Sequence, residues 1–295
     1  MNYKNKKMKV AFLGLGIMGS RMAANLLKNN VDLTVFNRSE MPLKELETKG
    51  AKIAGSFISA VNDADVVFTM LSAPDAIGEI MLSKGGCLSA MKKNSLWVDC
   101  STVDPEFSKK SGGKARQNAI RFMDASVAGT KAPAEDGTLT FFVGSDKLSL
   151  DEVEPLLLFM GTKVIHVGEI GMGTSLKMLV NAMLAESMIV FSETLLLGEK
   201  MGLSKDLLFD TLPNLPVIAP FVKAKAELIK EKNFDPQFPL EWMLKDLHLI
   251  SKTALENKQT ILMGELARSI YLKANEQGFS RKDFSAIYQF LKKEF

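Results

Sequence analysis

The feature of this chain that most constrains its fold is a glycine-rich turn close to the N-terminus. Residues 9–13 form a short apolar run typical of a buried strand, residues 14–19 read Gly-Leu-Gly-Ile-Met-Gly, and residues 22–27 have helical apolar spacing. In such a strand, turn and helix, the first glycine permits a tight turn, the second lets a pyrophosphate approach the backbone, and the third permits close helix packing. The pattern predicts a dinucleotide site formed by Gly14, Leu15, Gly16, Ile17, Met18 and Gly19.

A second predicted strand, residues 32–36, ends in Asn37-Arg38-Ser39. Folds that bind NAD usually carry an acidic residue at this place for the ribose 2′-hydroxyl. An arginine suits a 2′-phosphate instead, because its planar guanidinium matches the phosphate oxygens. We therefore expect these three residues to contact the cofactor, and we favour NADP(H) over NAD(H). The alternative is an exposed loop arginine without a ligand.

Apolar runs at residues 65–71 and 94–99 each lead into small polar residues. Ligands of open parallel sheets lie beyond the carboxyl ends of the strands. This position favours Leu71, Ser72 and Thr102 as cofactor contacts, although serine and threonine also cap helices in every kind of fold.

The segment 126–140 follows a predicted strand at residues 121–125 and is rich in glycine and small residues. Polar loops of this length are more often functional than idle, so we expect a functional loop here. Further strands are predicted at residues 139–143 and 162–167. The alternation of strands and helices predicts an α/β fold with a Rossmann-type, doubly wound parallel sheet.

A long apolar segment runs from residue 171 to residue 202. Within it, Lys177 and Asn181 are four residues apart and share one helical face. Because the helix is apolar nearly all round, we expect it to be buried and to join two domains. A lysine at such a place either extends its ammonium group to water or has a catalytic task, and the spacing alone leaves both open.

Every periodic segment after this helix is helical. The predicted organisation is therefore an NADP-binding Rossmann-type domain at residues 1–168, a long interdomain helix at residues 169–201, and an all-α domain at residues 202–295. We expect this last domain to serve substrate binding and oligomerisation.

Composition excludes several classes of function. The chain has 37 basic and 34 acidic residues and a net charge of +3, which argues against a nucleic-acid partner. Polar residues interrupt the long apolar helix, so we expect no membrane insertion. Two cysteines in 295 residues fit a reducing, cytoplasmic location. The two histidines have no metal-ligand spacing, and we expect no metal site.

Taken together, these motifs resemble the β-hydroxyacid dehydrogenase family, which includes 3-hydroxyisobutyrate dehydrogenases and several semialdehyde and glyoxylate reductases. The glycine-rich loop of the family matches residues 14–19, and its substrate loop lies over residues 124–130. Its Gly-x-Gly-x-x-x-Lys-x-x-x-Asn helix matches residues 171–181, and its Lys-Asp-Leu motif matches residues 245–247.

The resemblance implies roles for individual residues. Lys177 is expected to be the catalytic acid or base, and Asn181 to help hold the substrate oxygen. Thr102 and Lys245 are expected to lie by the nicotinamide and the substrate. The Gly129–Thr130 turn is expected to receive the substrate carboxylate. An ordinary lysine is protonated at neutral pH, so Lys177 suits the acid of a reduction better than the base of an oxidation.

One departure from the family concerns the substrate loop. The family's Pro-Val-Ser is Ser126-Val127-Ala128 here, so the hydroxyl that usually binds the carboxylate is absent at residue 128. Either Ser126 or backbone N–H groups take its place, and Ser126 can do so only if the segment stays extended, because residues two apart then point to the same side.

The amino-acid sequence of residues 129–139 is most similar to that of the glyoxylate/succinic semialdehyde reductase branch. This implies NADPH-dependent reduction of a small aldehyde or keto acid by a homodimer or homotetramer. Three alternatives stay open: a 3-hydroxyisobutyrate-type dehydrogenase, an imine reductase, and a non-catalytic cofactor-binding relative.

Overall fold

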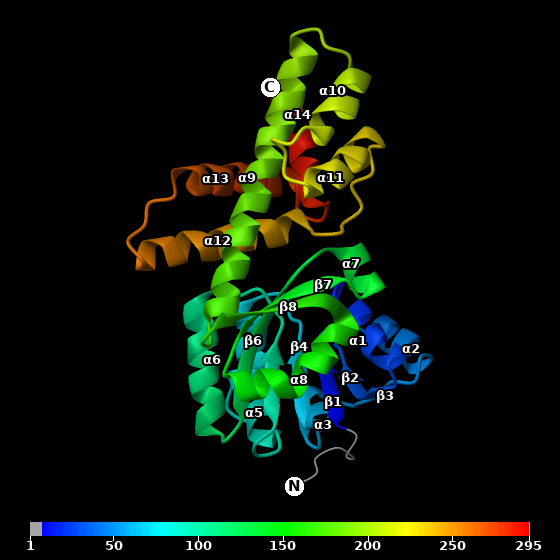
Figure 1. The fold of residues 1–295 in the computed structure, drawn as a ribbon, viewed down its shortest axis with the longest axis vertical. Coiled ribbons are helices and arrows are strands. Elements are labelled where there is room, and N and C mark those ends of the chain that lie inside the picture. Colours follow the sequence, from blue (N-terminus) through cyan, green and yellow to red (C-terminus); the bar gives the residue numbers. More distant parts are fainter. Residues whose placement is uncertain (1–7, 295) are drawn as a thin grey trace. The chain divides into compact units, whose positions relative to one another are not determined.

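The structure is a computed structural model that describes residues 8–294 (Figure 1). The chain divides into two compact units between Lys177 and Met178, which we call the N-terminal unit and the C-terminal unit. The N-terminal unit contains an eight-stranded sheet of order β3-β2-β1-β4-β5-β6-β7-β8. Neighbouring strands are parallel except β6 and β7, which are antiparallel. The strands are β1 (Lys9–Leu13), β2 (Asp32–Phe36), β3 (Lys52–Ile53), β4 (Val66–Thr69), β5 (Leu96–Asp99), β6 (Arg121–Ala128), β7 (Leu139–Gly144) and β8 (Gly161–Gly168).

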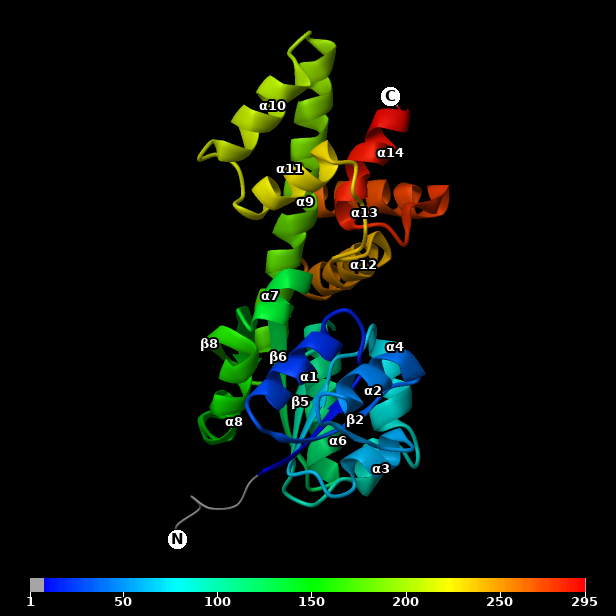
Figure 2. The same cartoon turned by 90° about the vertical axis from the view of Figure 1, so that its right-hand side faces the viewer.

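Helices cover both faces of this sheet, as expected for a doubly wound fold (Figure 2). Alternate strand residues enter two separate hydrophobic clusters: Phe12 packs with α1 and α8, whereas Leu13 packs with α3, α4 and α5. The helices of this unit are α1 (Gly19–Lys28), α2 (Glu40–Glu47), α3 (Phe57–Val61), α4 (Pro74–Ile77), α5 (Cys87–Ala90), α6 (Pro105–Gln117), α7 (Lys131–Asp136) and α8 (Lys147–Met160).

The segment 126–140 differs from the polar loop that we expected. Strand β6 continues to Ala128, because Ser126, Val127 and Ala128 pair with the antiparallel strand β7. Helix α7 then begins at Lys131, so only residues 129–130 separate the strand from the helix. The sequence showed no strand signal here, since small residues carry little strand preference without a partner strand.

Helix α9 (Met172–Lys200) begins in the N-terminal unit and continues into the C-terminal unit. The other helices of the C-terminal unit are α10 (Lys205–Thr211), α11 (Phe221–Lys230), α12 (Leu240–Glu256), α13 (Leu262–Ala274) and α14 (Ile287–Glu294). Helices α12 and α13 lie side by side in Figure 1. One hydrophobic cluster joins α9 to these helices, with Phe191, Met243 and Tyr271 among its buried members.

The expectation that α9 is buried on all sides is wrong. Leu179, Met183, Val190, Leu197 and Met201 are all exposed, with Met183 69% and Leu197 61% accessible. Their positions repeat at intervals of four and seven residues, so they form one apolar stripe along the helix. Among residues 8–294, α9 is the one helix whose length and apolar composition would suffice to cross a membrane, a property that core helices of soluble proteins share.

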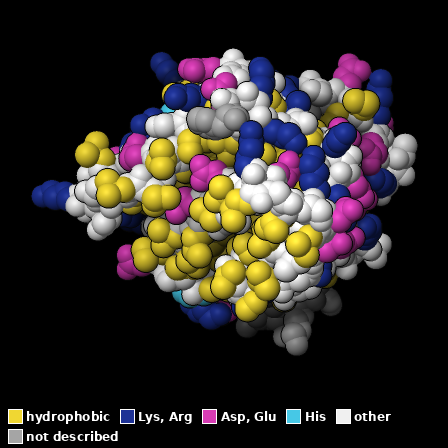
Figure 3. Space-filling model, turned by 90° about the horizontal axis from the view of Figure 1, so that it is seen from above, with side chains coloured by type: hydrophobic (Ala, Val, Ile, Leu, Met, Phe, Trp, Pro, Cys, Tyr) yellow, Lys and Arg dark blue, Asp and Glu magenta, His cyan; other side chains and the backbone are white. Residues whose placement is uncertain are grey.

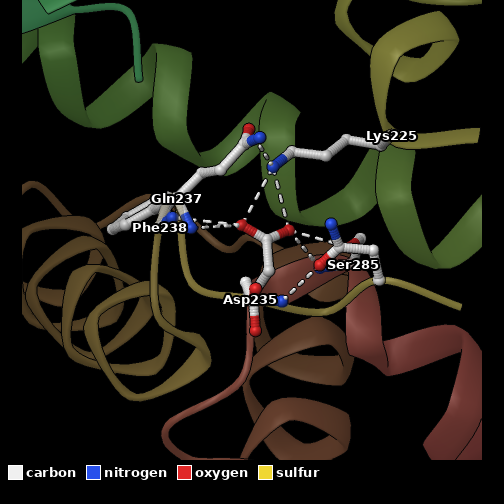
Figure 4. A network of polar contacts seen from close by, with 7 residues as sticks. Lys225, Asp235, Gln237, Phe238 and Ser285 are labelled. Carbon is white, nitrogen blue, oxygen red and sulfur yellow. Dashed lines mark hydrogen bonds and ion pairs between the residues drawn. The ribbon is translucent and has the colours of Figure 1, made fainter. Parts of the chain in front are cut away.

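A buried ion pair lies in the C-terminal unit (Figure 4). Lys225 on α11 places its Nζ 2.9 Å from both carboxylate oxygens of Asp283, and the two side chains are 5% and 0% exposed. The Asp283 carboxylate also accepts hydrogen bonds from the backbone N–H groups of Gln237 and Phe238 and from the Ser285 hydroxyl. Burial lowers the pKa of Lys225, and the neighbouring Asp283 carboxylate opposes that change.

Candidate active site

Strand ends of the N-terminal unit meet at one edge of the sheet. In the strand registers, Leu13 pairs with Phe36 and with Thr69, Thr69 pairs with Asp99, and Asp99 pairs with Asp124. These five residues therefore form one row across β2, β1, β4, β5 and β6. The segments directly after the first four strands contain the residues predicted to bind the cofactor, so the fold brings them to the same edge.

The glycine loop has the geometry that a dinucleotide requires. Gly14 has φ +93°, and a Cβ atom there would lie 2.3 Å from the backbone oxygen of Met70. A Cβ atom on Gly19, where α1 begins, would lie 2.0 Å from the oxygen of Gly14. Gly16 is exposed, and a Cβ atom there would meet nothing within 4 Å. The first turn of α1 contains no acidic residue, which leaves its N-terminal N–H groups suited to a phosphate. These features fit a pyrophosphate beside Gly16.

The segment after β2 is held next to this loop. Gly14 donates its backbone N–H to the oxygen of Phe36, and Leu15 donates its N–H to Oδ1 of Asn37 at 3.1 Å. Asn37 therefore orders the glycine loop through its side chain. Arg38 and Ser39 are exposed, and Arg38 forms no ion pair with any residue from 8 to 294.

The loops after β4 and β5 are hydrogen-bonded to each other. Leu71 donates its N–H to the Ser101 hydroxyl at 2.9 Å. The buried Asp99 carboxylate accepts hydrogen bonds from the Ser101 N–H and from the Thr69 hydroxyl. Burial raises the pKa of Asp99 to about 6. Ser72 is exposed and Thr102 is half-buried at this edge.

Strand β6 is tied to the first turn of α9 within the N-terminal unit. Asp124 is 1% exposed and accepts hydrogen bonds from the N–H groups of Gly171 at 2.6 Å and Thr174 at 2.8 Å. Ser126 is fully buried, with its hydroxyl 3.4 Å from the Thr174 hydroxyl. Because β6 stays extended, Ser126 points to the same side as Ala128, and its hydroxyl lies against α9.

The turn at Gly129–Thr130 follows directly. Gly129 has φ +127°, and a Cβ atom there would lie 2.6 Å from the Leu139 side chain, so the turn requires glycine. Thr130 is the N-cap of α7, yet its hydroxyl makes no capping hydrogen bond. Both residues are at least partly exposed to solvent.

Helix α9 carries Lys177 and Asn181 one turn apart. Lys177 is 7% exposed and Asn181 is 1% exposed. Within the C-terminal unit, the Asn181 amide donates a 2.5 Å hydrogen bond to Oδ2 of Asp246 on α12. The ammonium group of Lys245 lies 2.8 Å from Oδ1 of Asp246, an ion-pair distance although not in hydrogen-bond geometry. Asp246 thus brings Asn181 and Lys245 together.

Sequence reasoning placed Asp124 and Asp246 inside the family motifs at residues 124–130 and 245–247 but gave neither a role. Asp124 lies 47 residues before Gly171, and no local pattern connects them. The sequence pattern did point to Asp246, because it interrupts an apolar helix next to Lys245. A charged helix face exposed to solvent gives the same pattern, so the sequence alone could not assign a role. The residues from 8 to 294 contain no cluster of three or more histidine, cysteine or acidic side chains that could hold a metal ion.

Comparison with known proteins agrees with this geometry. Residues 9–168 match the family model of the NAD binding domain of 6-phosphogluconate dehydrogenase. Residues 171–291 match the model described as NAD-binding of NADP-dependent 3-hydroxyisobutyrate dehydrogenase.

Several full-length relatives are similar to the chain. Glyoxylate/succinic semialdehyde reductase 1 of Arabidopsis thaliana is 35% identical over 97% of this chain and 99% of its own length. Mitochondrial 3-hydroxyisobutyrate dehydrogenase of Homo sapiens is 35% identical over 98% of this chain and 88% of its own length. The structure of Mycobacterium tuberculosis 3-hydroxyisobutyrate dehydrogenase with L-serine superposes with a TM-score of 0.86 at 30% identity, covering 97% of this chain and 99% of that chain.

The fold and the glycine loop define a nicotinamide-dinucleotide-binding oxidoreductase. Because the family models cover both units and the relatives are full-length, this chain belongs to the β-hydroxyacid dehydrogenase family. The resemblance predicted from the sequence motifs is therefore confirmed, as is the predicted fold class. The division of the chain at residues 168 and 201 and the roles of individual residues stay predictions.

Proposed function

We propose that this protein is an NADPH-dependent reductase of small aldehydes or keto acids, of the glyoxylate/succinic semialdehyde type. The observation that carries the proposal is the burial of Lys177, 7% exposed, on the helix turn between the anchored Thr174 and Asn181. A buried lysine on an apolar helix is costly unless it has partners or a task, and a catalytic task is the one that the family resemblance implies. The similarity to plant glyoxylate/succinic semialdehyde reductases supports the substrate class.

Each residue has a defined part in this proposal. The reduced nicotinamide supplies the hydride when it is bound. Lys177 donates a proton to the oxygen of the carbonyl group as negative charge develops there, and its positive charge stabilises that oxygen. Asn181 hydrogen-bonds the same oxygen, and Asp246 holds the Asn181 amide. Backbone N–H groups of the Gly129–Thr130 turn receive the carboxylate of the substrate, in place of the serine missing at residue 128. Lys245 is a further substrate-binding residue of the proposal.

A panel of small aldehydes and keto acids with NADPH tests the function. We expect turnover of glyoxylate or succinic semialdehyde, and a fall in kcat of about 10²-fold or more in Lys177→Ala with the Kd for NADPH unchanged. Near-normal turnover by this variant would remove Lys177 from the mechanism. Oxidation of 3-hydroxyisobutyrate with no reduction of the panel would favour a 3-hydroxyisobutyrate-type dehydrogenase. Reduction of cyclic imines alone would favour an imine reductase. Binding of NADPH without any turnover would favour a non-catalytic relative.

The preference for NADPH rests on Arg38, which is exposed at the end of β2 beside the glycine loop. We expect Arg38→Asp to reverse the preference, because a carboxylate repels the 2′-phosphate and accepts hydrogen bonds from the 2′-hydroxyl. The ratio of kcat/KM for NADPH and NADH measures this. An unchanged ratio would contradict the assignment.

We further propose that the protein is a homodimer through one apolar face of the C-terminal unit. Two grooves share Val190 and Glu193 of α9: one, of about 640 Å³, extends to Leu197 and α14, and the other extends to Met263 and Leu266 of α13. Figure 3 shows hydrophobic side chains gathered on one face of the molecule. Exposed apolar patches of this extent mark interfaces.

The charges around this apolar face favour a second copy of the chain. Glu186 and Glu193 line the part nearer the start of α9. Lys200, Lys292 and Glu199 line the part nearer its end, where Glu199 pairs with Lys292 and one net positive charge is left. An antiparallel second copy, related by a two-fold axis, places the acidic part of one chain beside the basic part of the other. We expect Leu197→Glu to give monomers in light-scattering measurements. The control Leu148→Glu changes an even more exposed apolar residue on α8 and leaves the dimer intact. A dimer in both variants would refute this interface.

We retain a cytoplasmic location as part of the proposal. Cys87 and Cys100 are both free and buried, which suits a reducing compartment.

A further inference from the structure

We propose that Asp124 is a positioning residue that sets the start of α9, and thereby places Lys177 relative to the substrate turn. The inference rests on the proposed role of Lys177 and extends it to a residue that touches neither substrate nor cofactor. All the contacts that support it lie within the N-terminal unit.

Helix α9 has no side chain of its own to cap its first turn. Gly171, the residue before Met172, has no side chain at all and has φ +93°. The N–H groups of a first helical turn have no partner inside the helix and need an acceptor from elsewhere. Asp124 supplies it from β6: Oδ1 accepts the Gly171 N–H and Oδ2 accepts the Thr174 N–H. These are the two N–H groups that a local capping box satisfies.

Close packing around the Asp124 carboxylate fixes its position. A Cβ atom on Gly144 would lie 2.5 Å from Oδ1, and a Cβ atom on Gly173 would lie 2.8 Å from Oδ2. Glycine at both positions therefore lets β7 and α9 approach the carboxylate closely. The Thr174 hydroxyl is also held, 3.1 Å from Ser108 and 3.4 Å from Ser126.

The anchor lies between two parts of the proposed site. Thr174 is three residues before Lys177, so both belong to the same turn and side of α9. Asp124 is also five residues before Gly129 on the strand that leads to the substrate turn. Any shift of the helix start relative to β6 therefore changes the distance between the Lys177 ammonium group and that turn. Misplacement of a catalytic group by about 1 Å can lower a rate by about 10²-fold.

Two variants test the proposal from opposite sides of the contact. Asp124→Asn keeps the size of the side chain but presents an NH₂ group to one of the two N–H donors. Gly173→Ala changes no polar group but inserts a Cβ atom 2.4 Å from the Phe142 oxygen and against Oδ2, which displaces the first turn. We expect kcat to fall by about 10- to 100-fold in both, with the Kd for NADPH unchanged within about 2-fold. Because kcat is expressed per NADPH-binding site, a loss of folded protein does not mimic this result.

A matched control separates positioning from capping as such. Asp146 caps α8, which carries no residue of the proposed site, by accepting the Ser149 N–H at 2.8 Å. Asp146→Ala is expected to lower Tm by a few degrees, as the loss of a helix cap does, and to leave kcat unchanged. Asp124→Asn and Gly173→Ala with full kcat, beside an inactive Lys177→Ala, would overturn the proposal for Asp124 alone. An active Lys177→Ala would overturn the proposed function, and the role of Asp124 with it.

Discussion

The two units of the molecule stabilise their buried carboxylates in different ways. In the N-terminal unit, Asp99 and Asp124 accept hydrogen bonds from N–H and hydroxyl donors, and neither forms an ion pair with any residue from 8 to 294. In the C-terminal unit, Asp246 and Asp283 each lie next to a lysine ammonium group at 2.8 and 2.9 Å. Asp283 also accepts backbone N–H groups, so the difference between the units is the cation beside each carboxylate of the C-terminal unit.

This difference follows from what surrounds each group. The carboxyl ends of parallel strands and the start of α9 present many backbone N–H groups, and a helix start attracts negative charge. Helices use most of their own N–H groups, and the N–H groups that reach Asp283 come from residues 237–238 and Ser285, outside the α-helices. A buried carboxylate there needs a cation, and removing one partner of such a pair is expensive.

The largest expected effect comes from breaking the cation-paired arrangement. Lys225→Met leaves the Asp283 carboxylate without its cation, and we expect the free energy of unfolding to fall by about 3–5 kcal/mol. Urea denaturation measures it. The control is Lys230→Met on the same helix, which removes an exposed pair with Asp210 and is expected to cost much less, because water screens an exposed pair. Equal losses in the two variants would show that burial of the pair contributes nothing.

A second effect concerns Asp246, which joins Asn181 and Lys245. Asp246→Ala leaves the Asn181 amide without its acceptor, and we expect kcat/KM for the carbonyl substrate to fall by about 10- to 100-fold. Asp246→Asn keeps an acceptor for Asn181 and is expected to recover part of the loss. The exposed Glu256 on the same helix provides a control, since Glu256→Ala removes only a surface pair with Lys252. Full activity in Asp246→Ala would place Asn181 outside the mechanism.

The smallest effect is a pH dependence from the two buried carboxylates of the N-terminal unit. Burial raises the pKa of Asp99 and of Asp124 to about 6, well above the value near 3.9 of an unfolded chain. Between about pH 6 and pH 4 the folded state therefore binds protons that the unfolded state does not. Stability contributed by these groups rises as the pH falls, by at most about 1.4 kcal/mol per pH unit for each group.

Asp99→Asn isolates this contribution. Asparagine does not titrate, so the variant lacks this gain. We expect the unfolding free energy of the parent protein to increase relative to that of the variant as the pH is lowered from 7 to 4.5. Urea titrations at several pH values measure the difference. A difference that does not change with pH would mean that Asp99 titrates normally.

Much of the fold could be predicted from local patterns. The glycine turn at residues 14–19, the alternation of strands and helices, and the helical C-terminal half are all encoded in short-range spacing. The row of strand ends then follows from the rule that parallel strands align their carboxyl ends. The extension of β6 through Ala128 could not be predicted, because it depends on pairing with β7.

The exposed side of α9 shows a second limit. Its composition correctly indicated a long apolar helix, but Met183 and Leu197 are exposed rather than buried. Apolar residues on every side of a helix indicate that each side packs against protein. They do not show whether the packing surface belongs to the same chain or to another.

By itself, the sequence determined the class of fold, the family, and the residue types available for chemistry, because each of these depends on periodicity or on a short motif. Tertiary structure alone decided that Asp124 caps a helix 47 residues further along the chain, that Ser126 faces that helix, and that Asp246 joins Asn181 to Lys245. The physical reason is that hydrogen bonds depend on distances of about 3 Å between atoms, and separation along the chain says nothing about such distances until the strands and helices have packed.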